Sequence, residues 1–262
     1  MSKDILYTIP STRRPHNVGR MQEFVQQPLW IVKDRKDYDD YVAAGAYEVV
    51  IRSKNDKSLR GARNLAIHLA GLDGKYNLQL DDDLMWVKAA SGPERHLLED
   101  VEVEDVAFQM VWAMEAVDTG VCGILTTNNH RQYQPFVSTW AFMCARFLLI
   151  DPSYNINFGS SETDFKEDWE LTCKFMSEVG RVARLGWILA SNSGSQKGGL
   201  AARRTTELEI QACRRLLNTY PHILRKNTKR IGQIQLKHNR TNMPETAKVA
   251  FAEVNATERD WS

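Results

Sequence analysis

The first 90 residues alternate short apolar segments, typical of buried strands, with segments of helical periodicity. The apolar segments are residues 5–9, 29–32, 48–52 and 76–80. Helices are expected at about 18–26, at about 38–44 and after Ser58. This alternation predicts a doubly wound, mainly parallel α/β sheet flanked by helices. In such sheets ligands bind beyond the carboxyl ends of the strands, which is where the polar clusters of this chain fall.

The second half is more mixed, and one domain accommodates the whole pattern. Its expected helices are 103–117, 168–178 and 205–217, and its expected strands are 121–127, 136–144, 147–150 and 181–190. A Gly/Ser-rich loop is expected at 191–199 and a polar tail at 242–262. With 262 residues, 43% hydrophobic and 26% charged, the chain has the composition of one globular domain.

Net charge and cysteine spacing exclude few classes of function. The net charge is +1, while Lys and Arg gather between residues 197 and 240. The cysteines never form a C-x-x-C pair, which favours reduced, packed thiols over a zinc site: they are Cys122, Cys144, Cys173 and Cys213. The N-terminus does not resemble a signal peptide, and no apolar run approaches the roughly 20 residues of a membrane span. A soluble, cytoplasmic protein without membrane contact is expected.

Three adjacent carboxylates, Asp81, Asp82 and Asp83, directly follow the strand at 76–80. They repel one another unless a cation binds, and Mg²⁺ or Mn²⁺ prefers such oxygen ligands together with substrate phosphates. Strand alternation would turn Asp81 and Asp83 one way and Asp82 the other. A solvated acidic turn is the alternative, but the position at the ligand-binding edge of a parallel sheet favours a metal site.

Three motifs occur in a fixed order: Ile9-Pro10-Ser11-Thr12-Arg13, then Gly61-Ala62-Arg63-Asn64, then Leu80-Asp81-Asp82-Asp83. Together they resemble the GT-A glycosyltransferases, which carry an Asp-any-Asp motif after a nucleotide-binding first half. More narrowly, with Ile31-Val32, Asp34 and Tyr38 added, the chain is similar to the phage glycosyltransferases associated with TET/JBP-type oxygenases. The resemblance covers roughly residues 5–190.

The resemblance implies a UDP-sugar donor and a divalent cation. Asp83 would be the principal metal ligand, and Asp81 would bind metal or ribose. Asp82 would turn away or bind the nucleotide. The remaining donor-binding residues implied are Pro10, Ser11, Thr12, Arg13, Asp34, Arg60, Arg63, Asn64 and Lys197. Arg63 has the alternative of pairing with the triplet alone.

Asp168, with Glu167 second, matches the carboxylate that acts as general base in inverting GT-A enzymes. A positioned base helps a sugar or pyrimidine hydroxyl attack the anomeric carbon. The competing explanation is structural, because acidic residues are favoured at a helix start. The sequence alone does not decide between inversion and retention.

Three further features concern the surroundings of this site. Many GT-A proteins place a histidine ligand after the strand that ends near Ala190, and here Asn192, Gln196 or His238 would have to substitute. The loop with Lys197 suits closure over a diphosphate. The segment Thr126-Thr127-Asn128-Asn129-His130 could meet donor or acceptor, and Trp140 could stack on either, although most such tryptophans are core residues.

The basic region and the narrower resemblance together suggest double-stranded DNA as acceptor, with a hydroxymethylated pyrimidine such as 5-hydroxymethylcytosine flipped out of the duplex. The expected DNA contacts are Arg203, Arg204, Arg214, Arg215, Lys229 and Arg230. The expected organisation is one GT-A domain over 1–241, with a nucleotide-binding half (1–90), an acceptor half (91–200) and a basic helical region (201–241). If phage-encoded, the protein would act in the host cytoplasm.

Three other functions stay open at the level of sequence. A UDP-sugar glycosyltransferase acting on a protein or glycan keeps the donor site without DNA. A nucleotidyltransferase also uses acidic metal ligands, but the Gly-rich opening frequent in that class is missing. A non-catalytic nucleotide- or DNA-binding module would keep only the fold.

Overall fold

A computed structural model describes residues 4–52, 58–90, 98–127, 129, 132–159, 165–193, 205–230 and 232–237. Several sequence-based expectations fall outside these residues: those for Asn128, His130, Gln196, Lys197, Arg203, Arg204, His238 and the tail 242–262.

The first four strands form the parallel part of the sheet. Strands β1 (Ile5–Pro10), β2 (Leu29–Val32), β3 (Glu48–Ile51) and β4 (Tyr76–Leu80) pair in parallel in the order β3-β2-β1-β4. They alternate with α1 (Val18–Phe24), α2 (Arg35–Ala43) and α3 (Leu59–Leu72). Ser58 begins α3 by accepting a hydrogen bond from the Gly61 amide at 2.9 Å, as an N-cap serine does. The predicted alternation is therefore confirmed.

The second half extends the sheet in mixed orientation. Strand β9 (Phe147–Ile150) lies antiparallel between β4 and β7 (Val121–Thr126), and β10 (Ala183–Asn192) runs parallel to β7. Strands β5 (Leu84–Ala90) and β6 (Leu98–Asp100) complete the far side. The result is a ten-stranded, mostly parallel sheet in one domain, with the carboxyl ends of β1, β2, β4, β7 and β10 at one edge.

Four local expectations need correction. The hairpin β5–β6 was not predicted, and neither was the two-stranded sheet of β11 (Leu224–Lys226) and β12 (Ile234–Leu236). The strand expected at 136–144 is reduced to β8 (Val137–Ser138), and Ser191–Asn192 extend β10 instead of opening a loop. Buried and more exposed residues do alternate over 139–146. The Met143 amide, however, donates to the Thr172 hydroxyl at 3.1 Å and not to a neighbouring strand.

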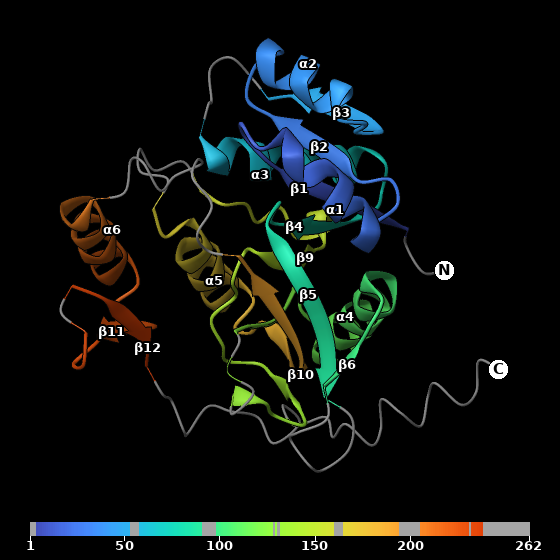
Figure 1. Ribbon diagram of the computed structural model, residues 1–262. Coiled ribbons are helices and arrows are strands. Elements are labelled where there is room, and N and C mark those ends of the chain that lie inside the picture. The colour runs from blue at the N-terminus through green and yellow to red at the C-terminus, as the bar shows by residue number, and fades with distance from the viewer. Residues whose placement is uncertain are drawn as a thin grey trace.

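Helices cover both faces of the sheet (Figure 1). On one face, α1, α2 and α4 (Val103–Val117) pack on Ile9, Trp30 and Leu80. On the other, α3 packs on Leu29 and Ile31. Helix α5 (Glu167–Glu178) shares a second core there with α6 (Thr206–Thr219) and the β11–β12 hairpin, which lie together at the side of the molecule. The four cysteines are free, and all but Cys144 are buried.

None of the helices in the described part of the chain combines the length and the apolar character that a bilayer crossing requires.

Candidate active site

The acidic triplet lies in the turn between β4 and β5, at the carboxyl edge of the sheet. Its three carboxylates contact three different parts of the molecule: Asp81 contacts α3, Asp82 the loop after β1, and Asp83 the end of β10. The triplet therefore connects the part of the sheet formed by β1–β4 to the end of β10.

The Asp82 side chain points into the protein, where its partners are other side chains. Its carboxylate accepts hydrogen bonds from the Ser11 hydroxyl and from Arg14 Nη1, at 2.6 Å in the second case. Ser11 in turn is hydrogen-bonded to the Tyr41 hydroxyl. Burial raises the pKa of Asp82 to about 6, against the opposing effects of Arg14 and Ser11. The side chains of Ser11 and Asp82, both expected to bind nucleotide, thus bind one another.

Asp81 is paired with the fully buried Arg63. Arg63 Nη2 donates to Asp81 Oδ1 at 2.8 Å, and Nη1 donates to the Ala145 carbonyl at 2.7 Å. Arg63 Nε lies 3.9 Å from Glu167 Oε1 at the start of α5. Arg63 therefore lies between Asp81, which follows β4, and Glu167, which begins α5. This ion pair with Asp81 is the alternative to donor binding that the sequence left open for Arg63.

Asp83 has Asn192 as its neighbour, the residue considered from sequence as a replacement for the usual histidine. Asn192 Nδ2 donates to Asp83 Oδ1 at 2.8 Å. Asn192 Oδ1 is buried and has no hydrogen-bond partner among the described residues. Because a buried oxygen without a partner is costly, this atom is suited to accept a bound cation.

The oxygen donors of Asp81, Asp83 and Asn192 fit Mg²⁺ or Mn²⁺. In the described ranges no three His, Cys, Asp or Glu side chains come together as a complete metal site. That agrees with how these cations usually bind, through one or two carboxylates and the phosphates of the substrate. The residues present therefore fit a cation that is shared with a diphosphate.

Glu167 and Asp168 begin α5 beside Arg63. The pKa of Glu167 is raised to about 8 by burial and by the neighbouring Asp168, and Arg63 opposes this. The pKa of Asp168 is also raised, mainly by burial, although the Trp169 amide donates to its Oδ1 at 2.8 Å. Raised carboxyl pKa values next to a cation are common at functional sites.

Several expected donor-binding residues lie around the ends of β1 and β2. Pro10 ends β1 and is buried, Thr12 is partly exposed, and Arg13 is exposed in the left-handed region at φ 59°. Asp34 caps α2 by accepting from the Asp37 amide at 3.0 Å, which lowers the pKa of Asp34. These positions lie at the carboxyl ends of β1 and β2, at one edge of the sheet.

Three other expected residues have structural partners. Arg60 is buried, 3.6 Å from Glu170. Asn64 Oδ1 accepts from the Phe158 amide at 2.9 Å. Trp140 Nε1 donates to the Lys237 carbonyl at 2.8 Å and thereby ties the end of the β12 segment to the domain.

The carboxyl ends of β7 and β10 enclose a cavity of about 520 Å³. Its lining is polar: Thr126, Thr127, Asn129, Arg146, Ala190, Ser191 and Asn192. Thr126, Thr127 and Asn129 come from the segment that was expected to meet donor or acceptor. Arg146 was missed, because only the antiparallel placement of β9 between β4 and β7 brings residue 146 to this edge.

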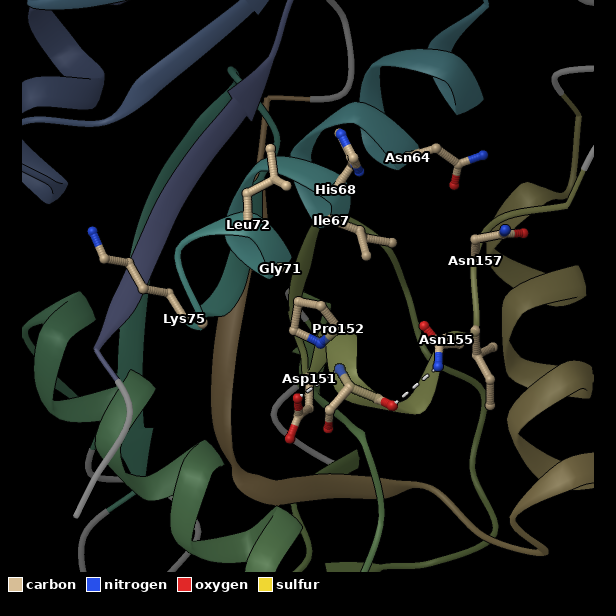
Figure 2. Close-up of a pocket in the computed structure, with 13 residues that line it drawn as sticks. Asn64, Ile67, His68, Gly71, Leu72, Lys75, Asp151, Pro152, Asn155 and Asn157 are labelled. Carbon is tan, nitrogen blue, oxygen red and sulfur yellow. Dashed lines mark hydrogen bonds between the residues drawn. The ribbon is translucent and has the colours of Figure 1, made fainter.

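A second cavity, of about 530 Å³, lies along α3 and is lined by none of the triplet (Figure 2). It runs from Asn64 past His68 toward Lys75, opposite Pro152 and Asn155. Apart from Asn64, no residue of its lining was expected to be functional.

The basic region divides into exposed and engaged residues. Arg214, Lys229 and Arg230 are exposed on α6 and in the turn between β11 and β12. Arg215, by contrast, donates to the buried Glu170 at 3.0 Å, so its charge is partly used inside the molecule.

The sheet order and the acidic edge are those of a GT-A type fold, and the comparison with one solved structure supports this fold. The mannosyltransferase PcManGT from Pyrobaculum calidifontis, in complex with GDP-Man and Mn²⁺, is similar with a TM-score of 0.54 and 12% sequence identity, over 85% of this chain and 69% of that one. TarS 1-349 from S. aureus matches with a TM-score of 0.49 at 12% identity, over 82% of this chain and 66% of that one. No protein-family model and no curated protein matches the chain.

Proposed function

We propose that the protein is a metal-dependent glycosyltransferase that uses a nucleotide-sugar donor. The observation that supports this most is the set of contacts made by the acids at the carboxyl edge of the sheet: Asp81, Glu167 and Asp168 lie around Arg63, and Asp83 is hydrogen-bonded to Asn192. The similarity to a solved mannosyltransferase that holds GDP-Man and Mn²⁺ supports the same class.

In this proposal Asp83, with Asp81 and Asn192 Oδ1, would hold the cation. A bound divalent cation supplies charge stabilisation for the departing diphosphate. Arg63 keeps Asp81 in place and lowers the mutual repulsion of the surrounding acids. Asp82 fixes the turn through Ser11 and Arg14 and does not need to touch the donor.

Asp168 is our candidate for the general base. It would accept the proton of the acceptor hydroxyl while that oxygen bonds to the anomeric carbon. Glu167, whose Oε1 lies 3.9 Å from Arg63 Nε, is the second candidate. Inversion at the anomeric carbon is the stereochemical course that this role implies.

At a finer level we propose UDP as the nucleotide of the donor, and a hydroxymethylated pyrimidine in DNA, such as 5-hydroxymethylcytosine, as the acceptor. The sequence resemblance to the TET/JBP-associated glycosyltransferases and the exposed cations Arg214, Lys229 and Arg230 support it. On this proposal residues 1–90 bind the nucleotide, 91–200 the acceptor and 201–241 the DNA backbone, in the cytoplasm, which is that of the host if the protein is phage-encoded.

Asp83→Asn tests the class of reaction. We expect the variant to lose roughly 100-fold or more of its Mn²⁺-dependent turnover of a nucleotide sugar, because the principal cation ligand is gone. Mass spectrometry of hydroxymethylated and plain DNA, with UDP- and GDP-sugars, reads transfer, and release of nucleoside diphosphate reads hydrolysis.

Asp100→Asn is the matched control, since Asp100 is an exposed acid of β6 whose partner is Lys88. Equal turnover by both variants would contradict the proposed class. Turnover without any mass gain on DNA would keep the class and replace the acceptor.

A further inference from the structure

The cavity at the ends of β7 and β10 has an unusual lining for a site that binds a neutral sugar alone. Hydroxyl and amide groups come from Thr126, Thr127, Asn129 and Ser191, and Asn192 of the proposed cation site lies at the edge of the cavity. Among the described residues that line it, Arg146 is the one charged side chain and none is a carboxylate. Arginine binds phosphate and carboxylate oxygens through paired hydrogen bonds, so such a lining selects a hydroxylated ligand that carries negative charge.

Hydrogen bonds hold the backbone at Arg146 in place, whereas its guanidinium group has no acidic partner among the described residues. The Arg146 carbonyl accepts from the Asp81 amide at 2.9 Å, and the preceding Ala145 carbonyl accepts from Arg63 at 2.7 Å. The side chain is exposed and forms no ion pair with the described residues, unlike Arg14, Arg60, Arg63 and Arg215, which all have acidic partners. The charge is therefore free for a ligand.

The cavity lies on the acceptor side of the triplet. The nucleotide rim is formed by the ends of β1 and β2, whereas Arg146 precedes β9, which separates β4 from β7. The predicted base lies on the same side, because Cys144, two residues before Arg146, interacts with both Thr126 and Asp168: burial is the main cause that raises the pKa of this thiol, Asp168 adds to the rise, and Thr126 and Arg146 oppose it.

We infer that Arg146 is the anion-binding residue of the acceptor subsite, and that the acceptor carries a phosphate group near its reacting hydroxyl. The inference rests on the proposed function and adds to it a chemical requirement on the acceptor. A phosphodiester of a nucleic acid and the phosphate of a smaller phosphorylated acceptor share this chemistry.

The test uses inorganic phosphate as the probe and the full chain saturated with UDP and Mn²⁺, with GDP in a parallel series. Calorimetry should find phosphate binding to the wild type that becomes about tenfold weaker or more in Arg146→Gln. Arg146→Lys should recover part of it. Arg181→Gln should bind phosphate as the wild type does, since Arg181 lies at the opposite end of β10 in a surface pair with Asp118.

Two results would overturn the inference. One is equal phosphate affinity in Arg146→Gln and the wild type. The other is loss of phosphate binding in the wild type when the nucleoside diphosphate is added, which would assign the anion to the donor. Both differ from failure of the proposed function, which is read separately as absent metal-dependent turnover. Turnover without a role for Arg146 defeats only the inference. Phosphate binding at Arg146 without turnover defeats the proposed function and with it the acceptor role of the site, and leaves Arg146 as an anion-binding residue.

Discussion

Arg63 is a buried cation that three segments share: the turn with Asp81, the segment before β9 with Ala145, and the start of α5 with Glu167. Its aromatic neighbour is Phe158, with the guanidinium carbon 5.6 Å from the ring centre. Removing one member of such a buried network leaves the others uncompensated. The side chain therefore supports both the fold and the position of Asp81.

Arg63→Met should lower the free energy of unfolding by about 3–5 kcal/mol, because Asp81 and Glu167 lose their common partner in a desolvated place. Urea denaturation at neutral pH measures it. Arg35→Met is the control, since Arg35 forms an exposed pair with Asp39 on α2 and such pairs contribute about 1 kcal/mol or less. Equal effects of the two changes would show that the Arg63 network adds no stability.

Glu167 predicts a pH dependence of stability whose sign can be worked out. Its pKa is raised from 4.5 to about 8 in the folded protein, so the protonated form is favoured by folding. The stability that this preference contributes is complete below about pH 4.5 and is lost as the pH rises through about 8.

Glu167→Gln removes this dependence because glutamine does not titrate. The free energy of unfolding of the variant, relative to the wild type, should therefore increase between pH 5 and pH 9, as measured by urea denaturation at several pH values. A constant difference across this range would mean that Glu167 titrates normally in the folded protein.

At the scale of elements, β10 connects three other strands to the acidic triplet. It pairs with β5, β7 and β8, and its last residue, Asn192, contacts Asp83. Gly186 lies in its middle, where a Cβ atom would come within 2.4 Å of the Gln134 carbonyl oxygen and 2.8 Å of the Phe136 carbonyl oxygen. Both obstacles are backbone, which cannot rotate away.

Gly186→Ala should therefore destabilise the protein by roughly 2 kcal/mol through overpacking. Gly19→Ala is the matched control, because Gly19 lies in α1 with nothing within 4 Å of the added Cβ, and alanine should stabilise the helix by about 0.5–1 kcal/mol. Thermal and urea unfolding report both. A neutral Gly186→Ala would mean that residues 134–136 move aside at little cost.

Local patterns predicted most elements but could not predict how distant strands pair. The bounds of β2, β4, β9 and α4 follow from apolar runs and helical periodicity, and the structure has them at the expected residues. The contact of Asn192 with Asp83 depends on the pairing of β10 with β5, a strand absent from the sequence reading. Arg146 likewise reaches the site only through the order β4-β9-β7, which no local signal specifies.

At the scale of the whole molecule, the basic region forms a separate unit beside the sheet. Helix α6 and the β11–β12 hairpin pack on α5 through Cys213, Leu216 and Ile234, and Trp140 secures the hairpin end. Exposed Arg214, Lys229 and Arg230 would act on a polyanion, whereas Arg215 also neutralises the buried Glu170. The basic residues of this unit therefore differ in role: some are exposed, and one pairs with a buried acid.

This difference gives DNA binding a specific expectation. Each of Arg214→Gln, Lys229→Gln and Arg230→Gln should leave stability nearly unchanged and reduce the slope of log affinity against log salt by about 1, since one phosphate contact is lost. Arg215→Gln should instead lower the free energy of unfolding, because Glu170 would keep only Arg60, at 3.6 Å. Fluorescence anisotropy with a labelled duplex between low and physiological salt measures the slopes.

If the three exposed changes leave slope and affinity unaltered, the basic unit does not contact DNA. The polyanion interpretation of residues 201–241 would then be wrong, while the donor site at Asp83 would be unaffected, because the two lie on different parts of the molecule and are tested by different readouts.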